Sequence, residues 1–187
     1  MKEIHETASE HNIPLICDEI QSGLGRSGKM WATEHFKVKP DIITSAKALG
    51  VGATIGKKEI FPKEDGRISS TWGEGNAMAT AVGYKTIEII QKEKLVQNAD
   101  KMGKYLRNRL KELMDSHKSI VEVRGLGLMD AIEIDSHKKR EQIVSNCLKK
   151  GLLLIGCGHN SIRFLPPLNV TKREIDLCVD ILDSVLK

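Results

Sequence analysis

Two short apolar segments, residues 15–17 and 41–44, most strongly constrain what this chain can fold into. Each has the length of a short strand, and the first stops at the charged pair Asp18 and Glu19, as a buried strand would. Residues 18–40 separate them, and a connection of that length suits a crossover better than a hairpin. The spacing therefore predicts parallel pairing in an α/β sheet, and we expect residues 53–55 to add a third strand.

The rest of the chain changes in character near residue 93. Helical patterns are expected at residues 2–11, 76–93, 95–114 and 138–150, and strands at 120–124, 128–134, 152–155 and 162–165. Thr171, with Glu174 three residues later, predicts a capping box that begins a final helix. We therefore expect residues 1–93 to be part of a parallel-sheet domain and residues 94–187 to form a compact α+β domain.

Composition excludes several classes of protein. The chain has 187 residues, 40% of them hydrophobic, and a net charge of +4 without a long basic block. Aromatic residues make up only 4%, which argues against a stacking platform for nucleic acid. No apolar run approaches the roughly 20 residues of a membrane span, and no secretory leader is evident. Scattered cysteines without C-x-x-C pairs favour a cytoplasmic protein, and the six histidines show no metal-ligand spacing.

Residues 23–28 spell G-x-G-x-x-G, which taken alone suggests dinucleotide binding. That fingerprint should follow a strand directly and open a helix. Here residues 18–22 intervene, and no clear apolar helix follows. A glycine-rich turn is the better interpretation, and a nicotinamide-dependent enzyme stays as the weaker alternative.

Asp18 and Lys47 carry more information together than apart. Asp18 ends the first predicted strand, and Lys47 follows the second between two alanines. A lone aspartate is usually a solvated loop residue and a lone lysine a surface cation. A carboxylate and an amine at adjacent strand ends, however, are what pyridoxal phosphate requires. The carboxylate keeps the pyridine nitrogen protonated, and a lysine in a crowded, weakly hydrated site can form a Schiff base.

At this point the sequence resembles a known family. The strings LICDEIQSGLGRSG at residues 15–28 and PDIITSAKALG at 40–50 resemble the signature of class III (ω-type) aminotransferases. The resemblance continues through STWG at 70–73, RGLGLM at 124–129 and IRFLPPL at 162–168, and so covers essentially the whole chain. It implies a fold-type I, pyridoxal-phosphate-dependent transferase with a partial large domain and a complete C-terminal small domain.

The resemblance also assigns roles to five residues. Asp18 would pair with the pyridine nitrogen, and Gln21 would lie near the phenolic oxygen of the ring. Lys47 would bind the cofactor covalently and then act as the catalytic base. Thr71 would reach the cofactor phosphate of a neighbouring subunit, and Arg163 would grip the substrate carboxylate, for which a planar guanidinium is well suited. Glu19 and Arg26 belong to the motif as well, and we interpret both as structural.

The implied reaction moves an amino group from an amino acid or ω-amine to a 2-oxo acid. The motifs favour relatives of 4-aminobutyrate and lysine 6-aminotransferases, while acetylornithine and ornithine aminotransferases, or racemases on the same scaffold, stay open. The family pattern carries Gly-Gly where residues 73–75 read Gly-Glu-Gly, which places Glu74 near a phosphate position.

The chain is also much shorter than the family's. The phosphate cup, the stacking aromatic residue and several strands are expected in a half that this sequence lacks. We therefore expect little activity from the chain alone, and a homodimer or a complementing N-terminal half as partner. A non-catalytic remnant or interaction protein is the alternative from another class.

Overall fold

The computed structural model describes residues 1–63 and 76–187, and it divides into two compact units. The first unit comprises residues 1–25 and 29–95, and the second comprises residues 26–28 and 96–187. The chain thus leaves the first unit briefly at Arg26 and finally after Leu95. Thr71 and Glu74 lie outside the described residues.

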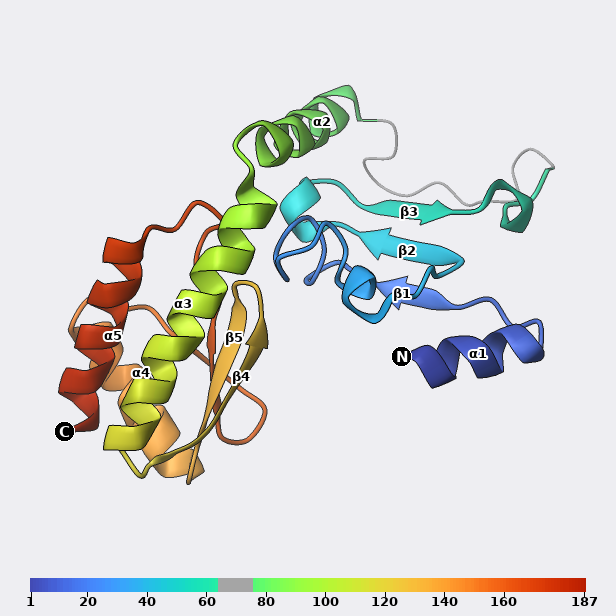
Figure 1. The fold of residues 1–187 in the computed structure, drawn as a ribbon. Coiled ribbons are helices and arrows are strands. Elements are labelled where there is room, and N and C mark those ends of the chain that lie inside the picture. Colours follow the sequence, from blue (N-terminus) through green and yellow to red (C-terminus); the bar gives the residue numbers. More distant parts are fainter. Residues whose placement is uncertain (64–75) are drawn as a thin grey trace. The chain divides into compact units, whose positions relative to one another are not determined.

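The first unit holds a three-stranded sheet and two longer helices (Figure 1). Its α-helices and strands are α1 (Lys2–Glu10), β1 (Ile16–Asp18), β2 (Ile42–Ser45), β3 (Ala53–Gly56) and α2 (Ala77–Lys92). Three short 3-10 helices lie among them, η1 (Ala32–Phe36), η2 (Lys47–Leu49) and η3 (Lys58–Ile60). Asn76 begins α2, and its side chain accepts a hydrogen bond from the backbone nitrogen of Ala79 at 3.0 Å.

The order of this sheet is β1-β2-β3. β1 and β2 pair in parallel, as the long connection between them predicts. β3 runs antiparallel to β2, so the expectation of a third parallel strand is wrong. Only residues 46–52 join β2 to β3, which is too short for a crossover. The chain instead turns back through η2 and Gly50, whose φ of 76° is a left-handed conformation that favours glycine.

The first unit buries few of its apolar side chains. Within residues 1–63 and 76–95, its buried hydrophobic residues are Cys17, Leu24, Val38, Leu49 and Ile90. Large apolar side chains are exposed on both helices and on the sheet. Met78 of α2, for example, is 78% exposed. No residue of α1 is buried. Among the described residues, more of the exposed large apolar side chains belong to the first unit than to the second.

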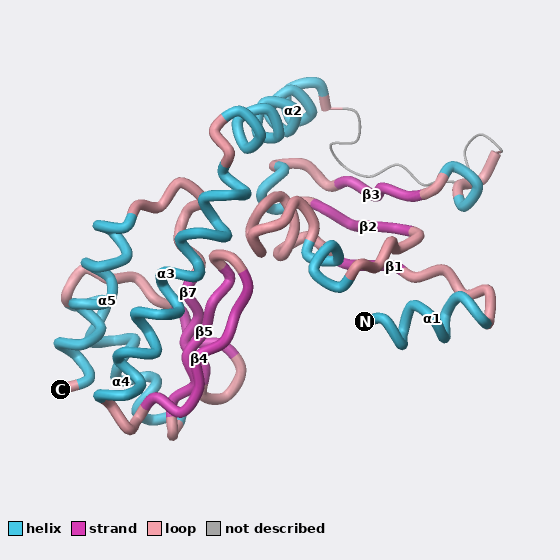
Figure 2. The backbone as a smooth tube through the Cα atoms, viewed as in Figure 1, coloured by secondary structure: helices cyan, strands magenta, loops and turns pink. Residues whose placement is uncertain are grey.

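The second unit is an antiparallel sheet with helices packed against one face (Figures 1 and 2). Its elements are α3 (Leu95–Ser116), β4 (Ile120–Leu126), β5 (Met129–Ile134), α4 (His137–Lys149), β6 (Ile155–Cys157), β7 (Ser161–Phe164) and α5 (Lys172–Leu186). The strand order is β4-β5-β7-β6. The predicted capping box at Thr171 and Glu174 is confirmed at the start of α5.

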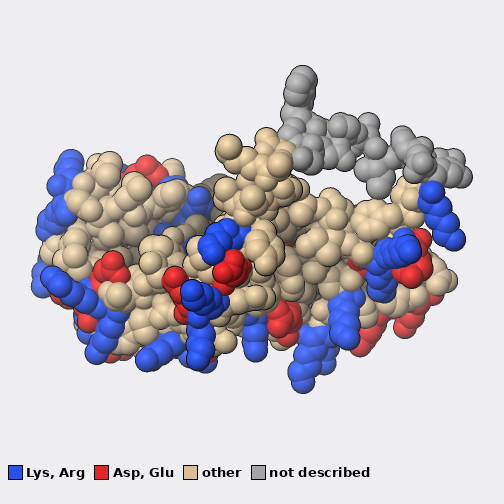
Figure 3. All heavy atoms as spheres, turned by 90° about the horizontal axis from the view of Figure 1, so that it is seen from above, with Lys and Arg blue, Asp and Glu red and all other residues tan. Residues whose placement is uncertain are grey.

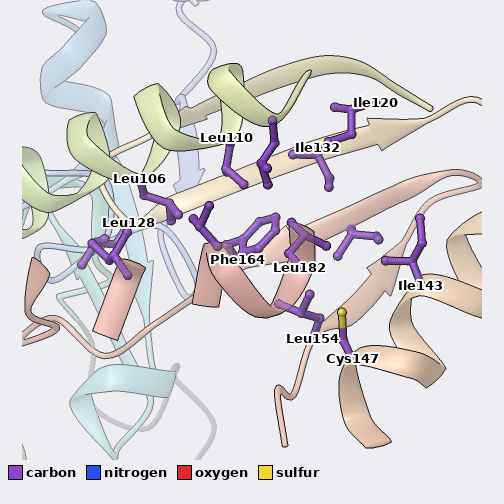
Figure 4. Packing of buried hydrophobic residues seen from close by; sticks show 14 of the residues in the cluster. Leu106, Leu110, Ile120, Leu128, Ile132, Ile143, Cys147, Leu154, Phe164 and Leu182 are labelled. Carbon is purple, nitrogen blue, oxygen red and sulfur yellow. The ribbon is translucent and has the colours of Figure 1, made fainter. Parts of the chain in front are cut away.

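One hydrophobic cluster forms the core of the second unit (Figure 4). Residues from α3, α4, α5 and the sheet meet there, and they include Leu110, Ile132, Ile162 and Leu182, which are fully buried. Burial of this kind contributes roughly 1.5–3 kcal/mol for each large side chain. This core is what holds β7 in place beneath the helices.

The strand expected at residues 152–155 begins later than predicted. β6 starts at Ile155, and the preceding leucines form a loop that folds over the end of α4. Gly151, with a φ of 83°, turns the chain, and the backbone nitrogen of Leu152 donates to the carbonyl of Cys147 at 2.9 Å. Leu154 is buried in the core, whereas Leu153 is 73% exposed. The apolar residues 152–154 therefore belong to a loop and not to the strand expected there.

Candidate functional site

Asp18 lies at the carboxyl end of β1, where open α/β sheets place their ligands. It pairs in register with Thr44 of β2. Its Oδ1 accepts a hydrogen bond from the backbone nitrogen of Ile20 and another from the hydroxyl of Thr44, each at 3.0 Å. These two bonds fix the orientation of an otherwise exposed carboxylate.

Lys47 follows β2 by two residues and opens η2. Because β1 and β2 are parallel, their carboxyl ends meet at one edge of the sheet, so Asp18 and Lys47 belong to the same edge. Leu49 is buried and anchors η2, whereas Lys47 itself is exposed. The weakly hydrated surroundings expected for this lysine are therefore not provided by the described residues of this chain.

Gln21 lies in the loop that follows β1, and it is half-buried. Glu19 organises that loop and is only 2% exposed. Its carboxylate accepts hydrogen bonds from the Ser22 hydroxyl at 2.5 Å and from the backbone nitrogen of Thr33 at 2.8 Å. Burial, helped by the charge of Glu19, raises the pKa of the Cys17 thiol, which keeps that thiol protonated.

Arg163 belongs to the second unit and lies in the middle of β7. It pairs with Ala131 of β5 on one side and with Ile155 of β6 on the other. Its Nε is buried and has no hydrogen-bond partner within the described residues. Arg163 also lines a mainly apolar cavity of about 410 Å³, whose other walls include residues 152–155, Pro166, Pro167 and Cys178.

The structure therefore places Asp18, Gln21 and Lys47 in the first unit and Arg163 in the second, while Thr71 is not described. Sequence reasoning missed Thr44, which orients Asp18 by a side-chain hydrogen bond. The sequence carried only part of the signal: predicted parallel pairing brings the carboxyl ends of the two strands together, but the register that places Thr44 beside Asp18 comes from the structure.

Sequence reasoning also missed Asp130, a fully buried carboxylate in the second unit. It forms an ion pair with Arg107 of α3, with Nη1 and Oδ1 2.5 Å apart. Burial raises the pKa of Asp130 to about 6, because desolvation outweighs the stabilising guanidinium. Nothing in the local pattern of residues 124–130 predicts that this aspartate is buried.

On the face of the molecule in Figure 3, the Lys and Arg side chains of the described residues are interspersed with Asp and Glu. Within residues 1–63 and 76–187, no three His, Cys, Asp or Glu side chains gather as they would around a metal ion. No helix in that same part of the chain is long and apolar enough to cross a bilayer.

A family profile described as Aminotransferase class-III matches residues 1–186. The chain belongs to the class III aminotransferase family. Acetylornithine aminotransferases are among the relatives of this class III chain. That of Caldanaerobacter subterraneus subsp. tengcongensis is 41% identical over 100% of this chain and 48% of its own length. That of Methanothermobacter thermautotrophicus is 38% identical, with the same two coverages.

Solved structures agree with the family assignment. A Bacillus anthracis aminotransferase has a TM-score of 0.92 and 32% identity, over 100% of this chain and 47% of its own. A lysine aminotransferase from M. tuberculosis has a TM-score of 0.89 and 30% identity, over 97% and 43%. The fold is thus that of the pyridoxal-phosphate-dependent aminotransferases, and this class III chain spans about half the length of the relatives it matches.

Proposed function

We propose that this chain supplies the lysine and the ring-nitrogen partner of a pyridoxal-phosphate site that moves an amino group to a 2-oxo acid. The observation that carries the proposal is the position of Asp18 and Lys47 at the carboxyl ends of adjacent parallel strands. The donor set fits the cofactor. Asp18 offers a carboxylate whose orientation is fixed by Thr44, and Lys47 offers an exposed amine.

Each residue has a separate task in this proposal. The bound cofactor supplies a protonated ring that accepts electrons from the substrate carbon. Asp18 holds the proton on the pyridine nitrogen, and Gln21 donates to the phenolic oxygen. Lys47 binds the cofactor and, once released, carries a proton at its Nζ to and from the substrate carbon. Thr71 binds phosphate, and Arg163 binds the substrate carboxylate through its planar fork.

The amino donor is proposed to be an ω-amino acid. Two kinds of relative support this: acetylornithine aminotransferases in sequence and a lysine aminotransferase in structure. Both names describe donors that carry a carboxylate as well as an amine. The guanidinium of Arg163 is suited to binding that carboxylate. The acceptor is proposed to be a 2-oxo acid such as 2-oxoglutarate.

Full activity is proposed to need a second polypeptide, either another copy or a complementing N-terminal half. The chain spans about half of its relatives, and the first unit leaves Ile16, Ile55 and Met78 exposed. Such surfaces favour association. Assayed alone with several amino donors and 2-oxoglutarate, the chain should turn over far more slowly than about 1 per second, an ordinary enzyme rate. A well-behaved isolated chain at that rate would contradict this part.

Covalent labelling tests the role of Lys47 without requiring turnover. The purified chain is incubated with pyridoxal phosphate, reduced with borohydride and mapped by peptide mass spectrometry. The label should concentrate on Lys47. Lys58 is the matched control, because it is also exposed and also opens a three-residue 3-10 helix. Equal labelling of both lysines, or labelling unaffected by Lys47→Ala, would refute the assignment.

A further inference from the structure

Arg26 comes from the first signature string, but its contacts lie in the second unit. Its Nη1 donates hydrogen bonds to the carbonyl of Pro166 at 2.5 Å and to that of Leu128 at 3.3 Å. Its own carbonyl accepts from the backbone nitrogen of Leu128 at 3.0 Å. One guanidinium therefore joins two segments that lie more than 100 positions away along the chain.

The surrounding backbone leaves this segment little freedom. A Cβ built on Gly127 would lie 2.2 Å from the carbonyl carbon of Ser27 and 2.3 Å from the nitrogen of Gly28. A Cβ on Gly28 would lie 3.1 Å from the Cα of Asp100 in α3. Residues 26–28 are thus packed between the turn at residues 125–128 and helix α3. This packing fixes the backbone from which the Arg26 side chain extends.

Pro166 connects Arg26 to Arg163. It lies three residues after Arg163, in the segment that leaves β7 and forms a wall of the 410 Å³ cavity that Arg163 lines. The sheet holds the backbone of Arg163 through Ala131 and Ile155. In its side chain, by contrast, the buried Nε has no hydrogen-bond partner among the described residues. The direction of that side chain therefore depends on how firmly the wall beside it is held.

We propose that Arg26 is a positioning residue for Arg163, acting through the carbonyl of Pro166. A guanidinium suits this task because it presents several donors in a rigid plane, so one side chain can bridge two carbonyls. Both acceptors of Arg26 Nη1 are backbone carbonyls, so within the described residues this half-buried guanidinium serves by its geometry and not by an ion pair. The catalytic relevance of this positioning rests on the proposed function, in which Arg163 binds the substrate carboxylate.

Side-chain NMR of the full 187-residue chain tests the proposal. The readout is the exchange of the Arg163 Nε proton with water, which reports on that side chain and not on the fold as a whole. Arg26→Gln should speed this exchange about tenfold, the effect expected from losing one hydrogen bond of ordinary strength. Arg26→Lys, which keeps a charged donor, should fall between Arg26→Gln and the native chain. Arg173→Gln, at an exposed position on α5, is the matched control and should change nothing.

Amide exchange of the α4 and α5 cores should stay unchanged in these variants. If Arg26→Gln leaves the Arg163 proton as protected as before while the chain is folded, the proposal is wrong. If the variants do not fold, a measurement on the native chain tests the proposal instead. The Nη protons of Arg26 should give separate resonances because its rotation is restricted, and averaged resonances like those of Arg173 would overturn the proposal.

A titration with 2-oxoglutarate separates this inference from the proposed function. Binding should shift the Arg163 Nε resonance, and Arg26→Gln should raise the dissociation constant about tenfold for the same loss of one hydrogen bond. If the Arg163 resonance does not respond to the ligand but still depends on Arg26, the carboxylate role of Arg163 fails and its positioning by Arg26 stands. If it responds equally in both chains, the positioning fails and the carboxylate role stands.

Discussion

Replacing Gly103 with alanine tests the closest backbone contact in the second unit. A Cβ at this position of α3 would lie 1.6 Å from the carbonyl oxygen of Gly127 and 2.2 Å from its carbon. The turn cannot simply retreat, because residues 26–28 pack against Gly127 as well. Separating the two backbones would also lengthen the 2.8 Å hydrogen bond from Arg107 to the Gly127 carbonyl.

Opposing terms set the size of the effect. Alanine favours a helix over glycine by about 1 kcal/mol. Overpacking costs about 1–3 kcal/mol, and losing a hydrogen bond from a charged donor costs about 1.5–3 kcal/mol. We therefore expect Gly103→Ala to lower the free energy of unfolding of the second unit by about 1.5–5 kcal/mol, which is the sum of the two costs less the gain in helix propensity.

Urea denaturation followed by far-ultraviolet circular dichroism measures this change. The urea midpoint of the second unit's transition should fall by about 0.8–2.5 M for a denaturant slope of about 2 kcal/mol/M. Gly52→Ala is the control, because a Cβ there meets nothing within 4 Å. Lys101→Ala, at an exposed position of α3, controls for helix propensity. A Gly103→Ala chain as stable as the native one would show that the helix and the turn are not in the contact described.

Three further predictions follow from single residues. Burial raises the pKa of Asp130 from 3.8 to about 6, so the folded state binds the proton of this carboxyl more tightly than the unfolded state does. Up to about 3 kcal/mol of the free energy of unfolding should therefore be lost as the pH rises from 4 through 6. Asp130→Asn should lack that pH dependence when the free energy of unfolding is measured with urea at pH 4.5 and 7.5, and equal pH dependence in both chains would show that burial does not raise the pKa of Asp130. Thr171→Ala should remove the capping box and cost about 1 kcal/mol in thermal melts, with Thr171→Ser close to native. Met78→Ser and Tyr84→Ser, at two exposed positions of α2, should each reduce self-association in sedimentation velocity, and an unchanged distribution would mean that α2 is not part of the associating surface.

The sequence predicted those features of the fold that depend on neighbouring residues or on spacing. The length of residues 18–40 was enough to predict that β1 and β2 are parallel, and the capping box at Thr171 is a four-residue pattern. The direction of β3 was missed because it depends on the brevity of residues 46–52. The start of β6 was missed because apolar content alone does not distinguish a strand from a loop that covers a helix end.

The candidate site was predictable only in part for a similar reason. Asp18 and Lys47 stand at strand ends that the pattern locates. The hydrogen bond from Thr44 follows from strand register, which only the pairing reveals. The contacts of Arg26 join positions 102 and 140 residues apart, and no local pattern indicates them.

The return of residues 26–28 into the second unit also affects how this chain can be made and divided. During synthesis these residues leave the ribosome well before residues 96–187. They therefore cannot make their native contacts until the second unit has been synthesised. A gene fragment cut at the apparent linear boundary after Leu95 would encode the helices and sheet of the second unit without Arg26. Its turn at Gly127 would then face solvent where the native chain has backbone. A self-contained small domain would need residues 26–28 restored by a linker or a circular permutation.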